Sequence, residues 1–161
     1  MRIAVISDVV CPWCRIGKAN LMAAAERWTA ETGETVDVRM LPYLLDPIEP
    51  GVREGFRERF LKRKGIPEDQ MTMMFERVTQ VGAAQGIHFD FDKVETAVDT
   101  VPAHELMELV PEEMRLDLMD ALMEAYFEQG KDVGDPDVIL PIAKSAGLTD
   151  EQAAAIGPRL R

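Results

Sequence analysis

The sequence contains few of the residues that build metal sites and disulfide networks: two cysteines and two histidines among 161 residues. Two cysteines can close only one bridge, which excludes a disulfide-rich scaffold. A structural zinc site needs about four ligands, and His88 and His104 lie far along the chain from the pair Cys11 and Cys14. We therefore predict that the chain holds no metal.

Long apolar runs and an excess of positive charge are also absent. No segment has the roughly 20 consecutive apolar residues that a membrane-spanning helix needs. The apolar run near the N-terminus ends at Asp8 and is too short for a secretory signal. Basic residues number 18 against 29 acidic ones, for a formal net charge of -11. These features predict a cytoplasmic chain whose main partner is neither nucleic acid nor a membrane.

The N-terminal 41 residues show a change of hydrophobic period. Residues 3–6 form a continuous apolar run, which is typical of a strand covered on both faces. From Pro12 the apolar residues recur at helical spacing as far as Gly33, and residues 35–41 then alternate between polar and apolar. The pattern predicts a strand–helix–strand unit with two parallel strands.

The rest of the chain is predicted to be helical after a proline-rich loop over residues 41–51. The periodicity and the capping residues predict a short basic helix within 53–64, a helix through Met71 and Val81, helices beginning at Pro102 and Pro111, a helix capped by Asp135, and a last helix with a Thr149–Gln152 capping box.

Both cysteines lie at the junction of the first predicted strand and helix, in the segment SDVVCPWCRIGK (residues 7–18). Cys11 precedes Pro12, so its sulfur takes the N-cap position, where unpaired N–H groups and the helix dipole favour a thiolate. We therefore predict a lowered pKa for Cys11. Cys14 lies one turn later, close enough to form a disulfide. This arrangement predicts that Cys11 forms a mixed disulfide and Cys14 resolves it.

Other interpretations of the pair have less support. A structural disulfide across one helical turn closes too small a loop to stabilise much, and two inert core thiols are a further alternative. A C-x-x-C pair on a strand–helix–strand unit favours redox chemistry. We predict that Pro12 and Trp13 tune the redox potential or shape the substrate surface, and that His104 approaches the dithiol. Simple packing is the alternative for Trp13 and His104.

Three segments resemble one known family. SDVVCPWCRIGK is similar to the active-site segment of the DsbA-like thioredoxin superfamily, in particular its FrnE-type branch. DTVPAHEL (99–106) and the segment 124–148 resemble later parts of the same family, in the same order. The resemblance implies an α/β, thioredoxin-like fold, with a strand–helix–strand unit in residues 1–41. Residues 42–161 then hold a large helical insertion and the start of the return to the thioredoxin fold. The resemblance also implies disulfide oxidoreductase or isomerase activity on protein or small-molecule disulfides.

The superfamily leaves two further functions open. It includes 2-hydroxychromene-2-carboxylate isomerases and kappa-type glutathione transferases, which usually have serine at the position of Cys11 and use glutathione. Because both Cys11 and Cys14 are present, we favour redox exchange with no cofactor beyond the dithiol, while glutathione remains possible. The other alternative is an inactive binding module or a fragment.

The resemblance also implies a segment that the sequence does not show. A thioredoxin fold continues with two more strands, a cis-proline that faces the active-site sulfur, and a last helix. No match to the family's G-V-P-x-F segment follows Leu148, so we expect the C-terminal part of this fold to be missing. A two-stranded sheet with an open edge is not stable alone. We therefore expect a homodimer, a swapped assembly or a missing segment to cover the first strand.

Overall fold

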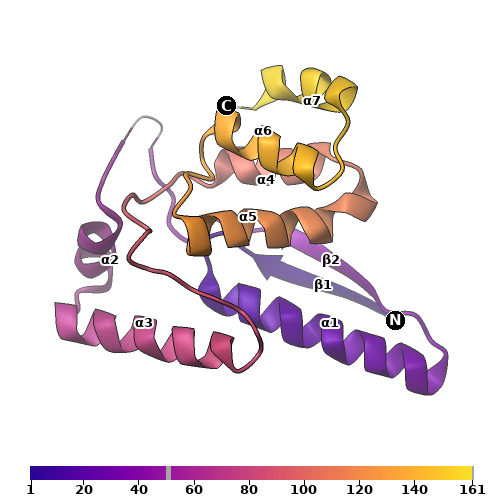
Figure 1. The fold of residues 1–161 in the computed structure, drawn as a ribbon, viewed down its shortest axis with the longest axis horizontal. Helices are drawn as coiled ribbons and strands as arrows, with labels where there is room; N and C mark the ends of the chain where they lie inside the picture. The colour runs from indigo at the N-terminus through magenta and orange to yellow at the C-terminus, as the bar shows by residue number, and fades with distance from the viewer. Residues whose placement is uncertain (50–51, 161) are drawn as a thin grey trace.

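The computed structural model describes residues 1–49 and 52–160 and contains the predicted strand–helix–strand unit (Figure 1). Strands β1 (Arg2–Ser7) and β2 (Asp37–Pro42) are parallel, with Ile3 opposite Val38, and α1 (Pro12–Thr32) connects them. Part of the proline-rich loop predicted over 41–51 lies outside the described residues, as does residue 161. The division of the chain after residue 41 stays a prediction.

The ends of α1 follow from the local sequence. Cys11 takes an extended conformation at the N-cap, and Pro12 occupies the first turn, where its missing N–H costs nothing. Gly33 ends the helix in the left-handed conformation, with φ 75°, and its N–H donates to the carbonyl of Thr29. Both predicted boundaries of this helix are therefore confirmed.

The remaining described residues are mainly helical, as predicted. The helices are α2 (Phe56–Lys64), α3 (Glu68–Ala83), α4 (Val101–Leu109), α5 (Arg115–Gln129), α6 (Pro136–Ser145) and α7 (Asp150–Ile156), with short 3-10 turns η1 (Glu112–Met114) and η2 (Gly157–Arg159). The Asp135 side chain caps α6, and Thr149 and Gln152 form the predicted capping box of α7. Figure 1 shows α4, α5 and α6 packed together, with α7 on α6.

The apolar core lies mainly among the helices. Leu118 and Leu122 of α5 are fully buried. Phenylalanines from several segments join one cluster: the rings of Phe75 in α3 and Phe91 in the following loop stack with centroids 4.3 Å apart, and Phe127 of α5 packs edge-on against Phe91. Because α5 contacts α1 and β2 as well as α4 and α6, this core connects the helices to the strand–helix–strand unit.

The two-stranded sheet is covered on one face only among the described residues. Ile3 and Val5 are half-buried, whereas Ile6 is 65% exposed and Leu41 of β2 is 44% exposed. One face of the first strand is therefore uncovered within the described residues, although its continuous apolar run is typical of a strand covered on both faces. The expectation that a second copy or another segment covers the strand stays a prediction.

Candidate active site

The candidate site begins at the N-cap of α1. The Sγ atom of Cys11 accepts a hydrogen bond from the backbone N–H of Cys14, with 3.2 Å between the two atoms. The first N–H groups of a helix have no partner within the helix, so an acceptor at this position satisfies one of them. As predicted, a sulfur takes the place that serine or aspartate takes in most helices.

The two sulfurs interact with each other. Both are free thiols and half-buried, and Cys14 also packs against the apolar core. A hydrogen bond between the side chains, followed by burial, raises the pKa of Cys11. The same hydrogen bond lowers the pKa of Cys14 to about 6, although burial opposes it.

In the free dithiol the lowered pKa therefore belongs to the pair, and the predicted lowering at Cys11 alone is not seen. The physical reason is that two hydrogen-bonded thiols titrate as a unit. The first proton leaves easily, because the remaining S–H donates to the new thiolate, and the second is held firmly. The sulfur that accepts this hydrogen bond has the lowered pKa, and the spacing of the two cysteines in the sequence does not determine which one it is.

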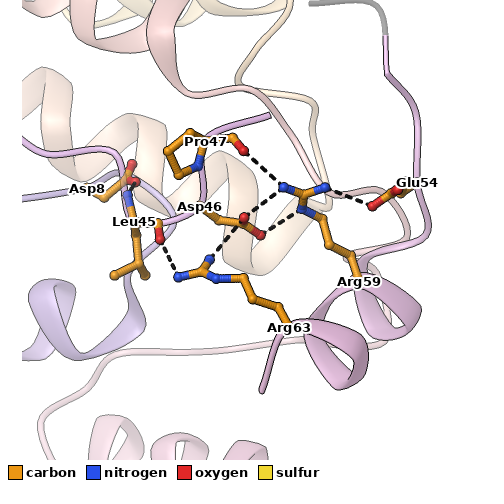
Figure 2. Close-up of polar contacts among 7 residues, drawn as sticks. All are labelled: Asp8, Leu45, Asp46, Pro47, Glu54, Arg59 and Arg63. Atoms are coloured by element: carbon orange, nitrogen blue, oxygen red, sulfur yellow. Dashed lines mark hydrogen bonds and ion pairs between the residues drawn. The ribbon is translucent and has the colours of Figure 1, made fainter. Parts of the chain in front are cut away.

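A buried carboxylate lies beneath the dithiol. Asp8 is 1% exposed, and its backbone carbonyl accepts the N–H of Cys11 at 3.1 Å. One carboxylate oxygen lies 3.2 Å from Nε2 of His104 in α4. The other accepts the N–H of Leu45 at 2.6 Å, as Figure 2 shows. The negative charge of Asp8 contributes to a higher pKa at both Cys11 and Cys14. Asp8 thus connects α4 and the loop after β2 to the start of α1.

The structure places the other predicted residues differently from one another. Trp13 is 48% exposed directly beside the dithiol. His88 is exposed and lies in the loop after α3. His104 is buried, with its Nε2 atom 3.2 Å from a carboxylate oxygen of Asp8. Its approach to the dithiol stays a prediction. The hydroxyl of Ser7 is buried close to Cys14 and lowers the pKa of that thiol. It has no other hydrogen-bond partner among the described residues.

Sequence reasoning missed Asp8 and Ser7. The signal was present: both residues follow directly on the first apolar run, three and four positions before Cys11. The end of a strand that leads into a reactive helix N-terminus brings its side chains close to that terminus.

Two long cations, also missed, hold the active-site helix in place. Arg15 donates to the carbonyl of His88 at 2.7 Å and to Glu128 of α5 at 2.5 Å. Lys18 is 4% exposed and pairs with Asp120 of α5 at 2.5 Å. No group of three or more histidine, cysteine or acidic side chains in residues 1–49 and 52–160 has the geometry of a metal site.

Replacement of Asp8 by asparagine tests its effect on the thiols. We expect Asp8→Asn to lower the pKa of the pair and to speed alkylation by iodoacetamide near pH 6 by about two- to fivefold, because a buried negative charge is removed. Asparagine keeps the shape and can still accept from Leu45. The measurement is the alkylation rate between pH 4 and 9.

The same loss of charge at an exposed site provides the control. Asp150 in α7 has a side chain that is 87% exposed, so Asp150→Asn should leave the alkylation profile unchanged. An Asp8→Asn profile identical to that of the unmodified chain would show that the carboxylate does not act on the dithiol.

The comparisons with known proteins agree with this geometry. A dithiol at the start of the helix in a parallel strand–helix–strand unit is the arrangement of thiol–disulfide exchange proteins. The family model described as DSBA-like thioredoxin domain matches residues 2–158, so the chain belongs to this family. No curated protein matches the sequence.

Solved structures give the same fold. The probable DsbA oxidoreductase SCO1869 from Streptomyces coelicolor is similar, with a TM-score of 0.85 and 25% identity over 97% of this chain and 67% of that one. The cytosolic disulfide reductase DsbM from Pseudomonas aeruginosa, solved with GSH, has a TM-score of 0.62 and 20% identity over 98% of this chain and 71% of its own. The α/β DsbA-like thioredoxin fold, mostly helical with a small parallel sheet, is therefore confirmed.

Proposed function

We propose that the chain is a thiol–disulfide oxidoreductase of the FrnE type that acts on protein or small-molecule disulfides. The observation that carries the proposal is the sulfur of Cys11 at the N-cap of α1, with Cys14 one turn away and donating its N–H to that sulfur. Membership of the DSBA-like family supports the same chemistry. In this proposal Cys11 forms the mixed disulfide and Cys14 resolves it.

The exchange proceeds in two balanced steps. The singly ionised pair passes its shared proton to Cys14 as the Cys11 sulfur attacks one sulfur of the substrate disulfide, so that one S–S bond forms and one breaks, and the leaving thiolate takes up a proton. Cys14 then loses its proton and attacks Cys11, which releases the second substrate thiol. Two electrons and two protons pass from the dithiol to the substrate. The reverse sequence oxidises a substrate dithiol.

The assignment of Cys11 as the attacking sulfur rests on the helix end. When the shared proton lies on Cys14, the backbone N–H groups and the positive end of the helix dipole stabilise the thiolate on Cys11. Cys14 packs against the core, which suits a sulfur that reacts only within the chain. Trp13 then forms part of the surface that meets the substrate, and Pro12 tunes the potential.

The proposal also includes a cytoplasmic location. The disulfide reductase from P. aeruginosa is named cytosolic, and no helix within residues 1–49 and 52–160 is both long and apolar enough to cross a bilayer. A dithiol in a reducing compartment is kept in the form that can attack a disulfide.

Insulin reduction with dithiothreitol as the electron donor tests the proposed function. We expect the chain to shorten the lag before the insulin B chain precipitates, and the same preparation alkylated with iodoacetamide to have no effect. If both preparations behave alike and the chain is retained on immobilised glutathione, a glutathione-dependent isomerase or transferase replaces this proposal.

A further inference from the structure

A cavity of about 110 Å³ lies beside the dithiol. Val10 and Pro12, the residues on either side of Cys11, form part of its wall. The aromatic part of the wall consists of Phe56, Phe60, Phe75, Phe91, Tyr126 and Phe127. Exposed residues, among them Leu45 and Lys64, also line it, so the cavity reaches the surface.

The cavity is formed before any ligand binds. Phe56 and Phe75 stack with centroids 5.7 Å apart, and Phe60 packs edge-on against Phe75 at 5.2 Å. A packed aromatic wall loses little conformational entropy on binding. An apolar cavity of about 150 Å³ accepts benzene, so this smaller one accepts a single aliphatic side chain.

A network of charged side chains fixes the loop that forms another wall (Figure 2). Arg59 of α2 donates twice to Asp46, at 2.8 Å each, and once to Glu54 at 2.8 Å. Arg63, one turn later, pairs with Asp46 at 3.1 Å and donates to the carbonyl of Leu45. Burial opposes ionisation of Asp46, but the hydrogen bonds from both arginines lower its pKa.

The cavity carries positive charge on an acidic chain. Arg59, Arg63 and Lys64 line it against the one carboxylate of Asp46, whereas the chain as a whole has a net charge of -11. Lys64 makes no ion pair with any residue that the structure describes. Its ammonium group is therefore available to an acidic group of a ligand.

From this arrangement we infer that the cavity binds the apolar side chain next to the reacting cysteine of a peptide disulfide, and that Lys64 pairs with an acidic residue beside it. The inference rests on the proposed function. A substrate cysteine joined to Cys11 lies against Val10 and Pro12, and its neighbouring side chain is within reach of the cavity that these residues line. The preferred substrates are therefore proteins or peptides with an apolar residue and an acid close to the cysteine.

Short peptide disulfides test the inference on the unmodified chain. Three symmetric disulfides differ in the two residues beside the cysteine, which are both glycine, both leucine or both phenylalanine. Two further leucine peptides carry glutamate or lysine next to the leucine. The measurement is the second-order rate of oxidation of the reduced chain by each peptide, divided by the rate for 2-mercaptoethanol with the same peptide. We expect leucine to exceed glycine about tenfold or more, phenylalanine, which is larger than the cavity, to exceed glycine by less, and glutamate to exceed lysine.

Two variants, each with a matched control, locate the effect. Ala97→Leu fills the cavity and should reduce the leucine-to-glycine ratio, whereas Ala154→Leu, on the exposed side of α7, should not. Lys64→Gln should reduce the glutamate-to-lysine ratio, whereas Lys62→Gln on the same helix should not.

The outcomes separate the two proposals. If every peptide reacts at the same rate, relative to its rate with 2-mercaptoethanol, the cavity is not a binding site, and the proposed function stays intact. Equal preference for glutamate in the Lys64→Gln and Lys62→Gln chains would overturn the role of Lys64. No reaction with any disulfide would overturn the proposed function and this inference with it. The peptide series decides the matter even if Ala97→Leu does not fold.

Discussion

Replacement of Cys11 by serine reduces disulfide exchange at least about 100-fold, because a serine hydroxyl is not ionised at neutral pH and does not form a stable bond to sulfur. Replacement of Cys14 leaves the attacking sulfur in place, so Cys14→Ser accumulates a mixed disulfide with the substrate. Mass spectrometry of each variant after incubation with insulin or a peptide disulfide gives the measurement. A mixed disulfide that accumulates on Cys14 in the Cys11→Ser chain would reverse the two roles.

The pH dependence of the same reaction follows from the pair. In the unmodified chain the pKa of Cys14 is lowered to about 6, so one thiolate is present above that pH and is lost as the pH falls through it. We therefore expect alkylation of the dithiol to rise with pH around 6. In Cys14→Ser, the thiol that raises the pKa of Cys11 is gone. Burial and Asp8 still raise the pKa of Cys11, and the backbone N–H at position 14 still lowers it, so we expect this pKa to be lower than in the unmodified chain.

Gly130→Ala should cost about 3 kcal/mol or more of stability, since both its backbone and its surroundings exclude a side chain. Gly130 ends α5 with φ 66°, and a Cβ atom there would lie 2.1 Å from the carbonyl oxygen of Lys93. The segment before Lys93 provides the carbonyl of His88 that holds Arg15, so the displaced loop would also loosen the active-site helix. Urea unfolding followed by circular dichroism measures the loss.

Gly33→Ala is the matched control for the cost of the left-handed backbone conformation alone. Gly33 also has a positive φ, 75°, but a Cβ atom there would meet no atom within 4 Å. This variant should cost only about 1 kcal/mol, the strain of a left-handed alanine. Equal losses for the two variants would show that the contact with Lys93 adds nothing.

Most helices and both strands could be predicted because their signals are local. Pro12 and Gly33 mark the ends of α1, and the Thr149–Gln152 capping box marks the start of α7. Each signal depends on residues within one or two turns of each other, so a single sequence contains the whole interaction. The predicted position of Cys11 at the helix N-cap was confirmed for the same reason.

The surroundings of the dithiol could not be predicted in this way. Asp8 and His104 are 96 residues apart, and Arg15 and Glu128 are 113 apart. The period of a strand or helix gives the face on which a side chain lies, but not the distant segment that packs against this face. The contact between His104 and the carboxylate of Asp8 was therefore missed.

The sequence by itself determined the reactive pair and its place at a helix N-terminus, since spacing, proline and the change of period act over a few residues. Only the tertiary structure decided which groups surround that pair: the buried Asp8, the aromatic cavity beside Pro12 and the cationic side of α2. It also decided that the two thiols share a hydrogen bond, which lowers the pKa of one and raises that of the other. Charge and burial act through space, and only the folded chain brings these distant segments together.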